Sequence, residues 1–550
     1  MSIENAMAFM GYKDLRSGQK KIIDELLYGN DVIGILPTGG GKSATFILPC
    51  LALRWRSIII SPLISLQDDQ VQKLKAKNIG AEAINSNRSV KDNQVILNKW
   101  ISGQLQFLYI APERLNNKEF VRKLLQVCRP NLLVIDEIHC VSQWADDFRP
   151  AYKLIPGFAE IMGEAKILGL TATLTPENED AVRRILKLKD AKKVEENRSR
   201  DNLHYRTSYG TSPRHVLRLC EKSDGPTIIY CPTVRQIDHE LFPYLQQRLN
   251  SKGGITKYHG RLKAEEKTRN QNMFMKNMAK FIVATNAFGM GVDKPDVRTV
   301  IHVNPPMSIE AYAQESGRAG RDGKPSNCIL MFDHADGFDT QKWFLDCKNP
   351  PKEDYEAVFE FVQSVTNNGE DNYRGPVASI AANLDLHENI VSSVLNVLQG
   401  ASIIRRDYVP YVDSIQRGEK VMPDDYDNKY LKKVYESVTD LMQFGAYSVE
   451  MAPAELAKKV QTSAHKLKSA LTLLADEGFL TYLPATRAKV TSLMKNSLDD
   501  INWEQLENKR KKEFQSFRNM IKFIEVDDST KAETIKKYFD EGVIDVDDDD

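Results

Sequence analysis

Residues 32–43 read VIGILPTGGGKS, a short apolar run followed by three consecutive glycines, a lysine and a serine. An apolar run of this length before a helical stretch, here residues 44–53, is typical of a buried strand in a parallel sheet. Glycines let backbone N–H groups face a phosphate, Lys42 can reach the terminal phosphates, and Ser43 offers a hydroxyl to Mg²⁺. The spacing departs from two glycines four residues apart, but the flanking strand and helix favour a phosphate-binding loop over a chance glycine turn.

A second stretch, LLVIDE at residues 132–137, is an apolar run that ends in two carboxylates. Open α/β sheets bind ligands at the carboxyl ends of their strands, so Asp136 and Glu137 are predicted to lie at such an edge. Asp136 is the natural partner of Mg²⁺, and Glu137 can orient or deprotonate an attacking water. Alone the pair is a weak signal, but about 95 residues after a phosphate-binding loop it indicates nucleotide hydrolysis.

Residues 314–321, QESGRAGR, space two arginines three positions apart, which on a helix places both on one face. A solvated basic face is the ordinary interpretation of such a pair. The two arginines lie far along the chain from the phosphate-binding loop, in the second of two α/β regions described below. We therefore expect Arg318 and Arg321 to reach a nucleotide that the first region holds. Arginine fingers of this kind would couple hydrolysis to closure of the two regions.

Short apolar runs alternate with helical patterns over roughly the first 300 residues. This alternation predicts parallel sheets with helices on both faces. The polar segment 195–212 divides the series, so we predict two α/β domains in tandem, at 1–205 and 206–348. The runs predicted as strands are 32–36, 57–60, 107–110, 132–135, 167–170, 227–230, 281–284 and 299–303.

The chain beyond residue 348 is helix-rich and contains an internal repeat at a constant offset of 76 residues. Each copy has a short helix, a turn, a longer helix and an extended apolar pair, the pattern of a helix-turn-helix followed by a wing. Two helical hairpins that merely pack on the front domains are the alternative. We predict units at 349–440, 441–497 and 498–550, with the second wing turning at 484–486. The matched positions are Ile380, Leu384, Val391, Leu395, Leu398, Ile403 and Ile404 with Leu456, Val460, Leu467, Leu471, Leu474, Phe479 and Leu480.

The charge of the chain is balanced in total but separated along its length, with 75 Lys+Arg and 75 Asp+Glu. Residues 1–350 hold 50 basic and 39 acidic residues, a net of +11, while residues 351–550 hold 25 and 36, a net of −11. The total excludes a wholly basic coat protein and an acidic disordered chain. Seven cysteines without a C-x-x-C pair, and no long apolar segment, predict a cytoplasmic protein without disulfides.

Taken in order, these segments resemble the motifs of superfamily 2 helicases, and specifically of the RecQ family, over residues 1–348. FMGYKDLRSGQ at 9–19 resembles the family's adenine-recognition motif, with Tyr12 stacking on the base and Gln19 bonding its edge. CVSQWADDFRP at 140–150 resembles the aromatic-rich loop that links DNA contact to ATP hydrolysis. The other matching segments are 37–43, DEIH at 136–139, LTAT at 170–173, IIYCP at 228–232, ATNAFGMGVDKP at 284–295 and 314–323.

The resemblance implies two RecA-like domains and a mostly helical region that use ATP and Mg²⁺ to move 3′ to 5′ on single-stranded DNA and to unwind duplexes. It implies catalytic roles for Lys42, Asp136, Glu137, His139, Arg318 and Arg321, with Ser43 and Asp136 holding Mg²⁺. ATP is expected to contact Tyr12, Arg16, Gln19, Thr38, Gly39, Gly40, Gly41, Lys42, Ser43, Gly291 and Asp293. DNA is expected to contact Ser61, Gln143, Trp144, Phe148, Arg149, His259, Thr285, Tyr482, Arg487 and Lys489.

The chain departs from the family in two places. Ala145-Asp146 stand where the aromatic-rich loop usually has Gly-His, and an acid there is expected to weaken the stimulation of hydrolysis by DNA. The usual four-cysteine zinc module cannot form, because no cysteine follows Cys347. The back half resembles a bacterial subgroup with a C-terminal zinc motif, in which Thr530, Ile544 and Asp547 replace cysteines. We therefore expect no structural zinc and a solvated acidic end.

We predict an ATP-dependent DNA helicase that acts as a monomer on single-stranded and duplex DNA. A DNA-stimulated ATPase or translocase that remodels nucleoprotein without strong unwinding is the alternative among enzymes. A winged-helix DNA-binding scaffold or regulator is the alternative from another class, and the complete hydrolytic set of residues disfavours it.

Overall fold

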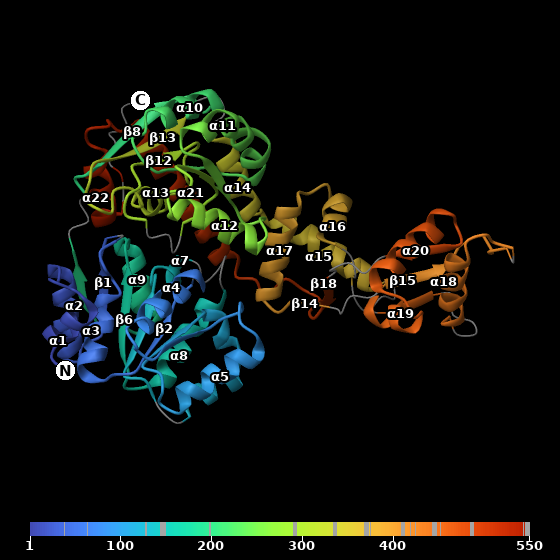
Figure 1. The fold of residues 1–550 in the computed structure, drawn as a ribbon, viewed down its shortest axis with the longest axis horizontal. Coiled ribbons are helices and arrows are strands. Elements are labelled where there is room, and N and C mark those ends of the chain that lie inside the picture. The colour runs from blue at the N-terminus through green and yellow to red at the C-terminus, as the bar shows by residue number, and fades with distance from the viewer. Residues whose placement is uncertain are drawn as a thin grey trace. The chain divides into compact units, whose positions relative to one another are not determined.

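The structure is a computed structural model, and it describes all residues except 38, 63, 127–128, 144–149, 197–199, 290–293, 334–337, 368–372, 374–375, 409–412, 419, 424, 443–447, 452, 484–488, 543 and 545–550. The chain divides into two compact units, Met1–Gln341 with Phe514–Asp550, and Lys342–Glu513 (Figure 1). The first unit holds two parallel sheets and the second the internal repeat, so the predicted fold class is confirmed. Because these units are larger than the five predicted domains, the individual boundaries stay predictions. Among the described residues, no helix is long and apolar enough to cross a membrane.

The first lobe is a parallel seven-stranded sheet in the order β3-β4-β2-β5-β6-β1-β7. Ile33 and Ile35 join the apolar core on one face, while Val32 and Leu36 join the core on the other, so both faces are covered. Its elements are α1 (Ile3–Met10), α2 (Ser17–Leu27), β1 (Val32–Ile35), α3 (Ala44–Leu53), β2 (Ser57–Ile60), α4 (Ile64–Lys75), β3 (Ala81–Ile84), α5 (Val90–Ile101), β4 (Phe107–Ile110), η1 (Pro112–Asn116), α6 (Lys118–Leu125), β5 (Leu132–Asp136), α7 (Cys140–Gln143), η2 (Pro150–Leu154), α8 (Ile155–Met162), β6 (Lys166–Thr171), α9 (Pro176–Ile185) and β7 (Lys192–Glu195).

The second lobe is a parallel six-stranded sheet in the order β10-β11-β9-β12-β13-β8. Its central strands carry apolar residues on both faces, in two separate cores. Its elements are β8 (Leu203–Tyr209), α10 (Pro213–Glu221), β9 (Thr227–Tyr230), η3 (Gln236–Leu241), α11 (Phe242–Leu249), η4 (Asn250–Lys252), β10 (Ile255–Tyr258), α12 (Ala264–Met275), β11 (Phe281–Ala284), β12 (Thr299–His302), α13 (Ile309–Ser316) and β13 (Ser326–Phe332). Helix α14 (Asp339–Lys348) then leads into the second unit.

The C-terminal tail returns to the second lobe. The end of α21 (Trp503–Glu525) and α22 (Lys531–Glu541) bury Met520, Phe523 and Tyr538 against Tyr312 of α13. Figure 1 shows α22, in dark red, beside β8, and α22 also contacts α9 of the first lobe. Lys531 is fully buried, and its ammonium donates to backbone carbonyls at the end of α21. The tail is therefore part of the first unit, together with the two lobes.

The second unit contains the predicted repeat, in the helices α15 (Lys352–Asn367), α16 (Val377–Leu384), α17 (Glu388–Gly400), α18 (Lys429–Asp440), α19 (Pro453–Lys459) and α20 (Ala464–Asp476). Helices α16 and α19 begin 76 residues apart (453 − 377), and so do α17 and α20 (464 − 388). The same offset relates β14 (Ile404–Tyr408) to β17 (Leu480–Leu483) and β15 (Asp413–Arg417) to β18 (Lys489–Leu493). The seven matched positions of each copy pack in the cores, which confirms the predicted repeat.

The two copies exchange their last strands. Strand β14 pairs with β18, while β15 pairs with β17 and with β16 (Ser448–Met451). Ile415 of the first copy is consequently buried in the core of the second, and Leu493 of the second packs on the core of the first. The predicted turn of the second wing at 484–486 lies outside the described residues. The described strands on either side of it, β17 and β18, pair with β15 and β14 and not with each other.

Backbone contact at Gly418 explains this choice of partner. The Gly418 N–H donates to the Phe479 carbonyl at 2.9 Å, and a Cβ at Gly418 would lie 2.2 Å from the Gly478 carbonyl oxygen. The equivalent residue of the other copy is Met494 (418 + 76), which does have a Cβ. Met494 lies against Ile403 instead. Returning each strand to its own copy would place that Cβ in the narrow space beside Gly478.

Candidate nucleotide-hydrolysis site

The phosphate-binding loop lies between β1 and α3, and the first turn of α2 contacts it from the side. Gly39 and Gly41 have φ values of 76° and 69°, in the left-handed region that glycine adopts without strain. The side-chain amide of Gln19 donates to the carbonyls of Gly40 and Gly41 at 3.0 and 3.1 Å, and its oxygen accepts from the Arg16 N–H at 2.9 Å. Gln19, which was expected to bond the adenine edge, thus supports the loop itself in this structure.

The acidic pair stands at the carboxyl end of β5. Asp136 ends the strand, and Glu137 follows it with a φ of 53°. Asp136 accepts hydrogen bonds from the Glu137 N–H at 3.1 Å and from the Ser61 hydroxyl at 3.2 Å. Burial, reinforced by the charge of Glu137, raises the pKa of Asp136 to about 6. Because Lys42 Nζ lies 3.9 Å from Glu137 Oε1, the loop lysine and both carboxylates meet at one sheet edge.

Glu137 lies in a strongly positive environment. Burial acts to raise the pKa of Glu137, but the charges of Lys42, Arg318 and Arg321 act against it, and the pKa is lowered. Glu137 is therefore ionised at neutral pH. A carboxylate that orients or deprotonates water must be in that state.

His139 is buried beside Glu137. Its Nδ1 lies 2.8 Å from Thr171 Oγ1 and 3.4 Å from Glu137 Oε2. The Thr171 hydroxyl donates to the Thr173 carbonyl, so Nδ1 of His139 is the donor to Thr171. Burial lowers the pKa of His139, which keeps the ring neutral at pH 7. Thr171 thus belongs to the site, and its place in the LTAT segment was the signal that could have found it.

The two arginines follow α13 of the second lobe and reach the site of the first. Arg318 is 5% exposed, and its charge acts on Glu137 together with that of Arg321. A Cβ at Gly39 would lie 3.4 Å from Cγ of Arg321, so this side chain lies against the phosphate-binding loop. The structure therefore brings both arginines together with the residues of the first lobe, and their action on a nucleotide stays a prediction.

The described residues that were expected to contact DNA in the two lobes are largely buried. Ser61 is 1% exposed and donates to Asp136, and His259 is 2% exposed with its Nε2 3.1 Å from Asp238 Oδ1. Thr285 is 8% exposed. The side chains of Ser61 and His259 contact neighbouring acids, and the Thr285 hydroxyl accepts from the Ala287 N–H, so a contact of these segments with DNA stays a prediction.

The structure describes only some of the remaining predicted residues. Tyr12 is half-buried in a small cluster with α3, and Tyr482 packs in the core that holds β17. Gln143 ends α7 and Lys489 begins β18, and both lie outside the described side chains. Thr38, Trp144, Phe148, Arg149, Gly291, Asp293 and Arg487 lie outside the described residues.

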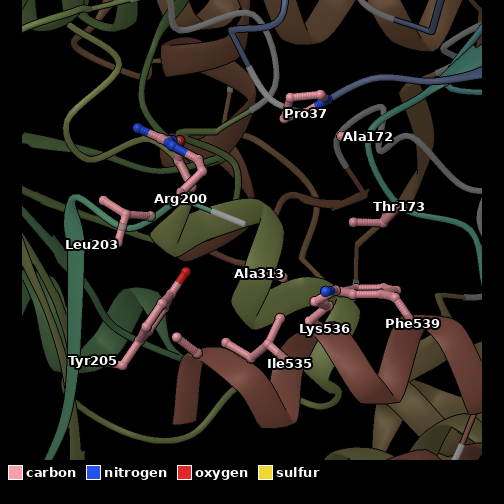
Figure 2. A pocket seen from close by; sticks show the side chains of 12 residues that line it. Pro37, Ala172, Thr173, Arg200, Leu203, Tyr205, Ala313, Ile535, Lys536 and Phe539 are labelled. Carbon is pink, nitrogen blue, oxygen red and sulfur yellow. Dashed lines mark hydrogen bonds between the residues drawn. The ribbon is translucent and has the colours of Figure 1, made fainter. Parts of the chain in front are cut away.

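The pocket between the two lobes is lined by four parts of the chain, one of which is the second lobe with Leu203, Tyr205 and Ala313. Pro37 and Thr173 come from the first lobe, and Arg200 comes from the segment that joins the lobes. Figure 2 shows Ile535, Lys536 and Phe539 of α22 around the same opening. The tail helix is therefore next to the nucleotide-hydrolysis site.

Comparisons with known proteins agree with this geometry. The family model described as DEAD/DEAH box helicase matches residues 16–182, and the model described as helicase conserved C-terminal domain matches residues 212–323. A solved structure of the DUF1998 helicase MrfA bound to DNA covers 74% of this chain and 57% of its own, with a TM-score of 0.53 and 16% identity. That likeness shows the fold alone.

Curated relatives narrow the family. The probable ATP-dependent DNA helicase RecS of Bacillus subtilis (strain 168) is 38% identical over 66% of this chain and 73% of its own length. The ATP-dependent DNA helicase RecQ of Haemophilus influenzae is 36% identical over 65% of this chain, and the match spans 58% of that relative. The chain belongs to the RecQ family of superfamily 2 ATP-dependent DNA helicases.

Proposed function

We propose that this chain hydrolyses ATP between its two lobes to move 3′ to 5′ along single-stranded DNA and to separate duplex strands. One observation carries the proposal: Lys42 and Glu137 of the first lobe and Arg318 and Arg321 of the second converge on one charged centre. A nucleotide phosphate at this centre holds the lobes together, and its loss on hydrolysis lets them part. Cycles of closing and opening move a bound strand.

The acidic pair and the loop serine fit Mg²⁺. Carboxylate and hydroxyl oxygens are the donors that this ion prefers, and Asp136 and Ser43 supply them. Burial and the charge of Glu137 raise the pKa of Asp136, and a cation bound to its carboxylate would offset both effects. When bound, Mg²⁺ neutralises the phosphate oxygens. Glu137 orients water, Lys42 holds the terminal phosphates, and the arginines stabilise the charge that develops.

Helix α20 of the second repeat supports contact with duplex DNA. Lys466 and Lys468 are exposed on this helix, which is the second helix of the helix-turn-helix. The equivalent residues of the first repeat are Ile390 (466 − 76) and Ser392 (468 − 76), so only the second copy has this basic pair. Phosphate contacts of this kind bind any sequence. These lysines lie outside the wing, on which the sequence pattern predicts the duplex contact with Tyr482, Arg487 and Lys489.

The function is tested with a duplex that carries a single-stranded tail. The unmodified chain with ATP and Mg²⁺ is expected to separate a 3′-tailed duplex and to leave a 5′-tailed one intact. Lys42→Ala is expected to lower hydrolysis by about 10²-fold or more, because it removes the cation that holds the phosphates. Hydrolysis without strand separation would favour a translocase. No hydrolysis by the unmodified chain would contradict the enzyme and leave a scaffold.

The duplex contact is tested by giving the second repeat the residues of the first. Lys466→Ile with Lys468→Ser is expected to weaken duplex binding about tenfold. The slope of the logarithm of the binding constant against the logarithm of the salt concentration is expected to become shallower by about two. Lys429→Ser with Lys433→Ser on α18 removes the same charge from other exposed positions and is the matched control. Equal binding by both double variants in a fluorescence titration would place the contact elsewhere.

A further inference from the structure

The segment that joins the two lobes contributes an arginine to the loop that carries the arginine fingers. β7 lies at the edge of the first sheet and β8 at the edge of the second, and Arg200 lies on the short connection between them. Its Nη1 donates to the Gly317 carbonyl at 2.6 Å, and its Nη2 donates to the carbonyls of Ala319 and Gly320 at 2.7 and 2.6 Å. The first two carbonyls flank Arg318 on both sides.

These three hydrogen bonds use a property that only arginine has. The guanidinium is planar and presents several N–H donors in fixed directions, whereas lysine has a single nitrogen. Within the described part of the chain, all hydrogen bonds of Arg200 go to backbone carbonyls. The guanidinium of Arg200 therefore holds the backbone of the loop in place, and it does so without an ion pair among the described residues.

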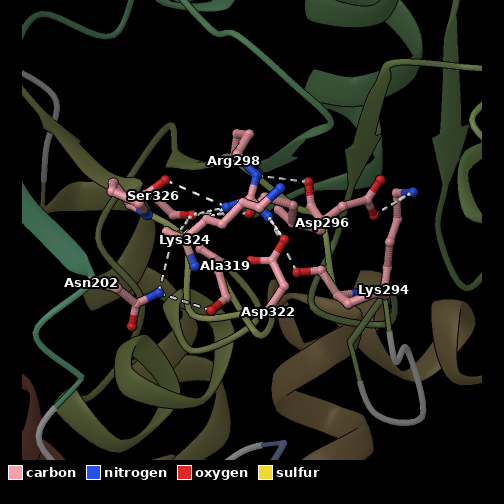
Figure 3. A network of polar contacts seen from close by, with 12 residues as sticks. Asn202, Lys294, Asp296, Arg298, Ala319, Asp322, Lys324 and Ser326 are labelled. Atoms are coloured by element: carbon pink, nitrogen blue, oxygen red, sulfur yellow. Dashed lines mark hydrogen bonds and ion pairs between the residues drawn. The ribbon is translucent and has the colours of Figure 1, made fainter.

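A second network, which shares only the Gly320 carbonyl with Arg200, holds the other side of the same loop (Figure 3). Asn202 donates to the carbonyls of Gly320 and Lys324 at 2.8 and 2.9 Å. Arg298 bonds the Asp322 carboxylate at 2.6 Å and Ser326 Oγ at 3.0 Å. This network begins at Gly320, so it supports the loop beyond Arg318. Arg200 alone of these side chains bonds the carbonyls of Gly317 and Ala319, the residues on either side of Arg318.

We propose that Arg200 is a positioning residue for ATP hydrolysis, which fixes the backbone around Arg318 and makes the arginine loop move together with Arg200. The inference rests on the proposed function, which supplies the phosphate on which Arg318 acts. When the lobes close, Arg200 and the loop move as one body, and Arg318 arrives at the first lobe in one orientation. A displacement of about 1 Å at such a group costs about 10²-fold in rate.

The inference is tested with Arg200→Lys, which keeps the charge but cannot form the hydrogen bonds to the carbonyls of Gly317 and Ala319 together. The kcat for ATP is expected to fall at least tenfold, while KM for ATP changes less than twofold. Affinity for ADP is expected to stay within twofold, and affinity for ADP with aluminium fluoride, which imitates the transferred phosphoryl group, is expected to fall at least tenfold. A purely structural role would lower both affinities and the thermal midpoint together.

Asn202→Ala is the matched control, because it removes two bonds to the same loop but none to the peptides that flank Arg318. Its kcat is expected to stay within threefold of the unmodified chain. Equal kcat for Arg200→Lys and the unmodified chain would overturn the inference, as would equal losses in Arg200→Lys and Asn202→Ala. Absence of hydrolysis in the unmodified chain would instead contradict the proposed function, so the two failures are distinguishable.

Discussion

Replacing Glu137 with glutamine is expected to lower kcat for ATP by about 10²- to 10⁴-fold, the usual contribution of a positioned acid or base. The carboxylate is ionised at neutral pH, since the charges of Lys42 and the two arginines outweigh its burial and lower its pKa. Glutamine has the same shape but cannot take a proton from water. Lys42 remains in place, so KM for ATP is expected to change less than threefold.

Steady-state phosphate release with and without single-stranded DNA measures this effect. Glu164→Gln is the matched control, because Glu164 is an exposed glutamate of the same lobe and loses the same charge. Its kcat is expected to equal that of the unmodified chain. If Glu137→Gln kept more than a tenth of the activity, another group would have to orient the water, and His139 would be the nearest candidate.

Phe523→Ala is expected to lower the free energy of unfolding of the first unit by about 3–5 kcal/mol, the range for truncating a buried phenylalanine. The side chain is 0% exposed, and its ring centroid lies 5.4 Å from that of Tyr312 in α13. The ammonium of Lys531 lies 5.4 Å from the same ring. Truncation removes these contacts and leaves a cavity between the tail and the second lobe.

Urea unfolding followed by tryptophan fluorescence measures the loss. Tyr28→Ala is the control, because Tyr28 is 81% exposed and its truncation is expected to cost less than about 0.5 kcal/mol. Equal free energies of unfolding for the two variants would mean that the tail does not stabilise the two lobes. Thr530 precedes α22, and Ile544 is buried in the same apolar cluster. That these two residues replace zinc-binding cysteines stays a prediction.

The strands at the centres of the two sheets were predictable, and those at the edges were not. All eight predicted runs correspond to strands, and each is an interior strand of its sheet. The edge strands β3, β7, β8 and β10 were missed. In β7 only Val194 is buried, because an edge strand has one neighbour and more contact with solvent. Strand β13 was missed although residues 328–332 are apolar, and nothing physical explains that omission.

The candidate site was predictable where neighbours in the chain make the chemistry. Lys42 follows its glycines directly, and Asp136 and Glu137 end one strand, so spacing was enough. Ser61 and Gln19 illustrate the opposite case. Their segments were identified, but their hydrogen bonds to Asp136 and to the phosphate-binding loop join residues that lie far apart in the chain. The same holds for Arg200, in a polar stretch that the pattern marked only as a boundary.

The sequence by itself determined the two parallel sheets, the phosphate-binding loop and a repeat of 76 residues, because each depends on short-range spacing. Only the tertiary structure decided which strand completes each repeat. Strands β15 and β18 occupy equivalent positions in the two copies, so pattern alone cannot distinguish their partners. The choice depends on the space beside Gly478, where Gly418 fits and Met494 would not. Such contacts join distant residues, and no local pattern records them.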